Sequence, residues 1–195
     1  WFLNKLRQSI YTPIISLEAS VCRSKEPIPF SHVKKMRFER IKTGDSWGGF
    51  FDCAWFKFSG NIDFLQTESL VAIIDVGAEG CIYNEYDAVQ GITNVLGTVD
   101  LFQSVSGKKV IPLSRISCVN NGKILFYADC GNNGRAGKSS GQARFKRADI
   151  CVVRQDILDL YYDILACYQL LSAVNDNAQK REIKAHINKA ISLAH

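Results

Sequence analysis

Between residues 36 and 155 the chain alternates apolar and polar residues with a period of two, and this constrains its fold more than any other feature. In one stretch Ala54, Phe56 and Phe58 share one face, and the opposite face includes Lys57. Alternation of this kind is typical of a strand that covers a core with one face. Eight short segments with strand character follow one another, at 36–42, 53–62, 69–76, 80–86, 88–92, 108–116, 123–130 and 143–155. Because turn sequences separate these segments and no helical pattern intervenes, we predict a mainly β fold, a β-sandwich or jelly roll.

The two ends of the chain have helical periodicity instead. Residues 1–12 predict a short amphipathic helix that ends at Pro13, and residues 21–35 are predicted to be irregular. Asp156 is the predicted N-cap of a long helix, and a second amphipathic helix follows it to form an αα-hairpin. The predicted organisation is an N-terminal helix and basic leader, a β-sandwich domain and a helical hairpin linker, at 1–35, 36–155 and 156–195.

Positive charge is concentrated in the leader. Residues 1–42 hold nine basic and three acidic residues, whereas residues 43–195 hold fifteen and sixteen. A basic segment suits either a nucleic-acid contact or a solvated, interface-forming leader. Because the basic residues do not form a recognition element with interleaved aromatic residues, the second interpretation is favoured. We therefore expect no nucleic-acid partner.

The cysteines indicate a reducing compartment. There are seven of them, widely spaced and without a Cys-x-x-Cys pair. Most lie within apolar segments, as small buried hydrophobic residues do. We therefore expect free thiols and a cytoplasmic protein. No apolar run approaches the length of a membrane span, so we expect no membrane partner.

Two possible ligand sites are disfavoured by spacing. The glycine-rich loop 131–141 invites comparison with a nucleotide-binding loop, but counting back from Gly137 places Asn132 where that motif needs glycine. Strand-like sequence also follows the loop where a helix N-terminus is required. A hairpin loop is the favoured interpretation. The histidines lack ligand-like spacing, so we expect no metal site in the chain; they are His32, His186 and His195.

Other polar and aromatic residues give weaker signals. Asp75, Glu79 and Glu85 are close enough in sequence to suggest a glycosidase carboxylate pair, but a local role in the turn between Gly77 and Gly80 is favoured. No catalytic residue is assigned. Aromatic residues are concentrated at 47–56, where sandwich core is favoured over a sugar-binding platform, although Trp47 is expected to be exposed. The candidate carbohydrate-binding residues are Trp47, Glu79 and Gln90.

Several short elements, taken in order, resemble a known family. They are Gly44, Trp47-Gly48, Ala54-Trp55-Phe56, Asp75-Val76-Gly77, Glu79-Gly80, Tyr83 and Gln90-Gly91. The segment 127–134 and the helical segments 158–174 and 181–195 continue the match. Together they resemble the N-terminal β-domain of the glycoside hydrolase family 38 α-mannosidases, in the cytosolic and vacuolar branch. Two departures are Ala78, where the family usually has a second glycine, and the long polar loop 131–142.

This resemblance implies a jelly-roll or galactose-binding-like domain of an enzyme that hydrolyses terminal α-mannose residues with retention. The zinc ion and the Asp nucleophile of that enzyme would lie in a catalytic domain beyond His195, which fits a chain that begins at Trp1 rather than Met. The chain itself would be non-catalytic and without a cofactor. Its partners would be the catalytic domain of the same polypeptide and other subunits of a homo-oligomer. The alternative is a carbohydrate-binding module with a glycan as partner, and the vacuole is the alternative location.

Overall fold

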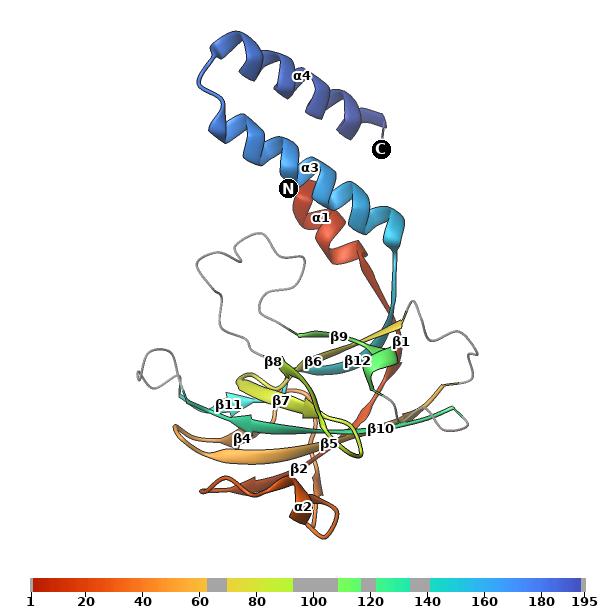
Figure 1. The fold of residues 1–195 in the computed structure, drawn as a ribbon, viewed down its shortest axis with the longest axis vertical. Helices are drawn as coiled ribbons and strands as arrows, with labels where there is room; N and C mark the ends of the chain where they lie inside the picture. The colour runs from red at the N-terminus through yellow and green to blue at the C-terminus, as the bar shows by residue number, and fades with distance from the viewer. Residues whose placement is uncertain (1, 63–69, 93–108, 117–121, 134–140, 194–195) are drawn as a thin grey trace. The chain divides into compact units, whose positions relative to one another are not determined.

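The computed structural model describes residues 2–62, 70–92, 109–116, 122–133 and 141–193 (Figure 1). The chain forms two compact units, one of Trp1–Thr12 with Val153–His195 and the other of Pro13–Val152. The larger unit is built of antiparallel strands, and the smaller unit is mainly helical. The predicted mainly β fold with a short N-terminal helix and two C-terminal helices is confirmed.

Two main sheets form the larger unit. One has six strands in the order β3-β2-β5-β10-β7-β8, and the other has four in the order β1-β12-β6-β9. A short pair, β11-β4, completes the described strands. Their bounds are β1 Tyr11–Ser16, β2 Glu18–Ser24, β3 Glu39–Arg40, β4 Ser46–Gly48, β5 Cys53–Asn61, β6 Leu70–Asp75, β7 Glu79–Tyr83, β8 Ala88–Ile92, β9 Val110–Pro112, β10 Lys123–Gly131, β11 Ala143–Arg144 and β12 Arg147–Val153.

The main hydrophobic core lies between the two sheets. β5 pairs with β10 over nine positions, and this register places Phe56 opposite Ala128 and Phe58 opposite Phe126. All four side chains are buried in the core. β6 is buried over nearly its whole length because it lies between β12 and β9, and its core residues include Ile74. The period-two pattern therefore predicted the inward face of β5 correctly.

A smaller apolar cluster covers part of the opposite face of the six-stranded sheet. Segment 25–38, which contains the short helix α2 (Phe30–Val33), lies over Trp55 and Tyr127. The Trp55 Nε1–H group donates a hydrogen bond to the Ile28 carbonyl at 2.8 Å, so the indole is buried without losing its polar contact. Val33 of α2 is fully buried in this cluster. Segment 25–38 is thus part of the β unit and covers one face of the six-stranded sheet.

The prediction that residues 21–35 are irregular is wrong at its start. Residues 18–24 form β2, which lies between β3 and β5 in the six-stranded sheet. The strand buries Ala19 and Val21, while its other positions are charged or small. Such a short alternation is a weak sequence signal, and it becomes a strand because β5 offers it a long neighbouring edge. The compact unit consequently begins at Pro13, whereas sequence placed the start of the sandwich at residue 36.

The helical unit contains α1 (Phe2–Ser9), α3 (Gln155–Ala173) and α4 (Asn177–Leu193). Its buried residues around α1 and α3 are Ile10, Tyr161 and Leu165. The predicted capping role of Asp156 is wrong, because α3 begins at Gln155 and the Asp156 carboxylate pairs with Arg154 at 2.8 Å. None of the helices in the described ranges is long and apolar enough to cross a membrane.

We predict that Gly77→Ala destabilises the sandwich far more than Gly141→Ala. Both glycines have positive φ, at 77° and 76°, so both substitutions incur backbone strain of roughly 1–2 kcal/mol. A Cβ at position 77 would also lie 2.2 Å from the Arg144 carbonyl oxygen, whereas position 141 is open. Urea unfolding should therefore show a loss of about 3 kcal/mol or more for Gly77→Ala. Equal losses in the two variants would contradict this reading.

Candidate functional site

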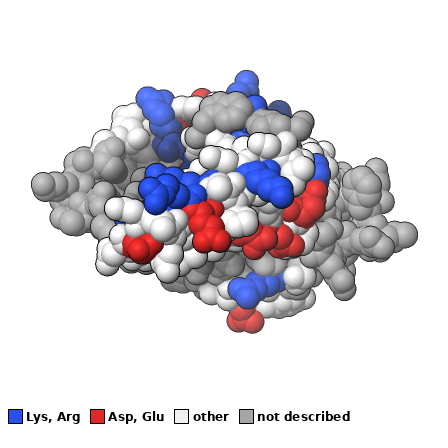
Figure 2. All heavy atoms as spheres, turned by 90° about the horizontal axis from the view of Figure 1, so that it is seen from above, with Lys and Arg blue, Asp and Glu red and all other residues white. Residues whose placement is uncertain are grey.

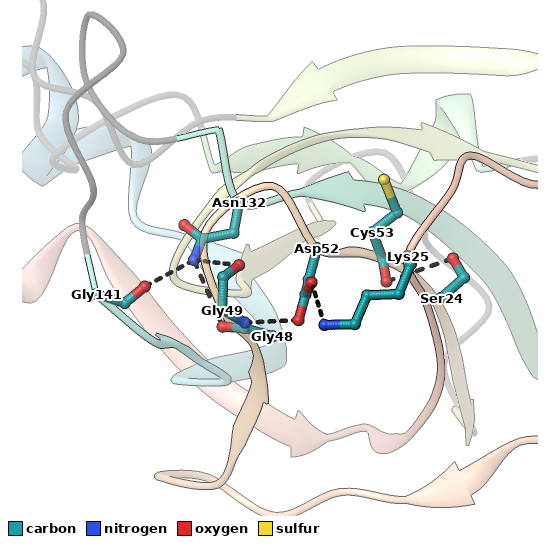
Figure 3. A network of polar contacts seen from close by, with 8 residues as sticks. All are labelled: Ser24, Lys25, Gly48, Gly49, Asp52, Cys53, Asn132 and Gly141. Carbon is teal, nitrogen blue, oxygen red and sulfur yellow. Dashed lines mark hydrogen bonds and ion pairs between the residues drawn. The ribbon is translucent and has the colours of Figure 1, made fainter.

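A network of polar contacts joins three loops at one end of the six-stranded sheet (Figure 3). The buried Asn132 side chain donates from Nδ2 to the carbonyl oxygens of Gly49, at 3.0 Å, and Gly141, at 2.9 Å. Asp52 accepts a hydrogen bond from the Gly49 N–H through Oδ2 and pairs with Lys25 through Oδ1 at 2.7 Å. Hydrogen bonding to Lys25 and then to Gly49 lowers the pKa of the Asp52 carboxyl. Each of these polar side chains therefore forms a hydrogen bond or an ion pair within the protein.

A cleft of about 450 Å³ opens beside this network. Its polar lining comes from Glu79 at the start of β7, Asp129 on β10 and Asn133 just after β10. Asn133 donates from Nδ2 to Glu79 Oε1 at 2.6 Å. The rest of the lining is small or apolar: Pro27, Cys53, Gly80, Cys81, Ile92, Cys130 and Gly131. Within the described part of the chain, the cleft lining therefore carries two carboxylates and no basic side chain.

Desolvation dominates the electrostatics of the cleft. Partial burial raises the pKa of the Asp129 carboxyl, and this carboxylate forms no hydrogen bond or ion pair with another described residue. Burial, and then the negative charge of Asp129, raises the pKa of the thiols of Cys53 and Cys81. The fully buried Cys130 thiol has a pKa well above its ordinary value for the same reasons. Since the thiolate is the reactive form, these cysteines are poor nucleophiles at neutral pH.

The three predicted carbohydrate-binding residues lie in three different environments. The expectation that Trp47 is exposed is wrong: only 2% of its surface is accessible, its ring meets that of Phe56 edge to face, and its Nε1–H donates to the Val76 carbonyl. Glu79 lies in the cleft. Gln90 on β8 donates from Nε2 to the Val110 carbonyl of β9, 2.9 Å away. The neighbouring glycines predicted a loop, whereas Trp47 lies in β4, and no local pattern indicates that the indole points into the core.

Asp75, another of the weighed residues, has structural partners. Asp75 accepts a hydrogen bond from the Gly77 N–H and pairs with Lys109 at 2.6 Å, as its favoured role in the turn implies. No group of three or more His, Cys, Asp or Glu side chains in the described ranges is arranged to hold a metal ion. Most of the glycine-rich loop, residues 134–140, lies outside the described residues. After it the chain enters β11, and not a helix.

Comparison with known families agrees with this architecture. The sequence profile described as "Alpha-mannosidase, jelly roll domain" matches residues 12–155. The chain belongs to this family. The matched range begins and ends close to the compact β unit at Pro13–Val152, and the helices α3 and α4 lie almost wholly outside it. A search of curated proteins finds no match.

The residues on which the family resemblance rests have structural roles in this jelly roll domain. Gly44 and Gly77 have positive φ, a conformation that glycine adopts without steric cost. A Cβ at Gly80 would lie 2.5 Å from the Asp129 carbonyl oxygen, because β7 and β10 are adjacent there. Trp47 fills the core, and Trp55 anchors segment 25–38. Ala78, the departure from the family pattern, is buried. These motif residues maintain turns and close packing.

We predict that Asn132→Ala costs about 2–3 kcal/mol of unfolding free energy, because three carbonyl oxygens lose their amide donor in a buried site. Asn133→Ala is the matched control. Asn133 is exposed, and its side chain forms one hydrogen bond with a described residue, Glu79. The loss of unfolding free energy in Asn133→Ala should therefore stay within about 0.5 kcal/mol. Urea titrations of both variants provide the comparison. Similar losses at the two positions would rule out a special role for Asn132.

We also predict a pH-dependent gain from Asp129→Asn. The raised pKa of Asp129 in the folded state means that the folded protein binds this proton more tightly than the unfolded chain, whose Asp pKa is about 3.9. The stability contributed by this group is therefore present below that pH and is lost as pH rises through the folded-state pKa. Asp129→Asn should raise the unfolding free energy relative to the parent at pH 7 and not at about pH 3. A constant difference across this range would contradict the assignment.

Proposed function

We propose that this chain is a non-catalytic domain of an α-mannosidase, which supports a catalytic domain of the same polypeptide and contributes to contacts between subunits. The observation that carries the proposal is the use of the family motif residues: they shape turns and pack the core. In the described part of the chain, no activated nucleophile lies beside a base. The thiols of Cys53 and Cys81 in the cleft have raised pKa values. The hydrolysis of terminal α-mannose residues, and the zinc or similar divalent ion expected with it, would belong to the catalytic domain.

The helical unit supports a docking role. Four of its large hydrophobic side chains are exposed: Tyr162, Tyr168, Leu170 and Leu193. Among the described residues of α4, Ile187 alone is buried. Exposed apolar side chains that form a patch mark sites of association with another protein, and the proposal assigns these helical residues that role. Figure 2 shows a face on which basic and acidic side chains are interspersed, so that face offers no broad surface of one sign.

The test uses both this chain and the longer enzyme that the proposal implies. The 195-residue chain alone should release no mannose from an aryl α-mannoside, with or without added zinc, while the longer polypeptide should be active. In the longer polypeptide, Leu170→Glu should reduce activity or assembly, because Leu170 is 52% exposed and would lose an apolar partner. Gln169→Glu, at the next exposed position of α3, is the matched control.

Zinc-dependent mannose release by the 195-residue chain would overturn the non-catalytic assignment. Equal activity and equal subunit assembly in the Leu170→Glu and Gln169→Glu enzymes would overturn the docking role of α3. Activity assays and sedimentation velocity measure the two outcomes separately.

A further inference from the structure

The outer face of the six-stranded sheet is divided into a covered half and an open half. Segment 25–38 covers the apolar half, which contains Trp55 and Tyr127. On the other side of that cluster a groove of about 750 Å³ remains open. Its volume lies within the range of sites that hold small ligands. Its lining is Ile15, Ser16, Glu18, Lys57, Ser59, Gly60, Asn61, Glu85, Lys123, Ile124 and Leu125.

Strand register brings the polar side chains of the groove together. Ser59 of β5 is opposite Glu18 of β2 on one side and Leu125 of β10 on the other. One step further along the same face, Asn61 is opposite Lys123. Because side chains two residues apart on a strand point to the same face, these groups converge from three neighbouring strands. The positions are set by rigid sheet pairing, which favours a preformed site.

Five polar side chains in this groove are unpaired within the described part of the chain. They form no hydrogen bond or ion pair with another described residue, and they are Lys57, Ser59, Asn61, Glu85 and Lys123. This distinguishes the groove from the network around Asn132, where each polar group has a protein partner. Among the described residues, the groove therefore presents hydroxyl, amide, ammonium and carboxylate groups that are not used in side-chain contacts.

The charges and the apolar residues narrow the class of ligand. The lining carries two ammonium groups, on Lys57 and Lys123, and two carboxylates, on Glu18 and Glu85, so it has both signs of charge. Glu18 also pairs with Arg40, 3.9 Å away. The lining combines hydrogen-bond donors and acceptors with apolar side chains such as Leu125. A sugar ring suits this combination, because its hydroxyls both donate and accept while its C–H faces are apolar. The cleft at Glu79 differs, since its described lining has two carboxylates and no basic side chain.

We propose that this groove binds a neutral oligosaccharide. The groove geometry carries the inference, and only the choice of mannose as the sugar rests on the proposed function. The ligand would lie across β2, β5 and β10, with its hydroxyls on Asn61, Ser59 and the two lysines. This location differs from the site predicted from Trp47, Glu79 and Gln90, whose side chains already have partners in the protein.

The test is a titration of the 195-residue chain with a linear α-linked mannotriose, followed by calorimetry and by backbone amide NMR. We expect saturable binding with Kd of about 1 mM or tighter and shift changes centred on β5 and the start of β10. Asn61→Leu and Lys123→Met should each weaken binding by about tenfold, because each removes hydrogen bonds to the sugar. Lys146→Met, at an exposed lysine outside the groove, should leave binding unchanged.

Absence of binding at about ten times that concentration, or shift changes centred on the cleft at Glu79 instead, would overturn the proposal. Unchanged affinity in Asn61→Leu and Lys123→Met would overturn it as well. Thermal unfolding of each variant distinguishes lost binding from lost folding. A failure here leaves the mannose-release assay unaffected, so the groove and the proposed function are tested independently.

Discussion

The pairing of β5 with β10 is the constraint on which the rest of the jelly roll domain depends. The two strands match over nine positions, from Asn61 opposite Lys123 to Cys53 opposite Gly131. This register directs Phe56, Phe58 and Phe126 toward the core between the sheets. A slip of one residue would turn these aromatic rings to the outside and bury Lys57 and Asp129 in their place, at a cost that the domain could not offset.

The same pairing divides the outer face of the sheet into three zones. In the middle, Trp55 and Tyr127 are apolar and are covered by segment 25–38. At the Cys53–Gly131 end is the acidic cleft, where burial raises the pKa of Asp129. At the Asn61–Lys123 end is the groove, whose lining has both signs of charge. One face of the sheet thus has a covered apolar zone in the middle, a cleft at one end and a groove at the other. Segment 25–38 leaves the polar groups at both ends accessible.

Sequence patterns predicted the strands best where one face is long and strongly apolar. β5 and β10 were recognisable from residues such as Phe56 and Phe126, because alternation reports burial directly, and β6 was recognisable as a continuous apolar run. β2 was missed, since its buried residues are small and its structure depends on its neighbour β5. The strand with which β2 forms its longer pairing, β5, is distant in sequence, as Glu18 opposite Ser59 illustrates. Local sequence does not contain that information.

The candidate sites were harder to predict, and Trp47 shows why. Its neighbouring glycines predict a loop, whereas the residue lies in the short strand β4, and they do not indicate where the ring points. The answer depends on the Val76 carbonyl, which follows β6 and accepts the indole N–H. Likewise, the groove residues Ser59 and Lys123 are unremarkable in sequence, and only the register makes them neighbours of Glu18 and Asn61.

The distribution of polar partners separates structural from ligand-binding regions in this chain. Motif residues such as Trp47, Gly77 and Asp75 have contacts inside the protein that stabilise the fold. Lys57 and Asn61 lie outside those motifs, and their side chains form no polar contact with another described residue. A family motif therefore identifies the jelly roll, whereas a ligand specific to this chain would be recognised by side chains that the motif does not include. The proposed recognition site accordingly lies at the Asn61–Lys123 end of the β5–β10 pair and not in the aromatic segment 47–56.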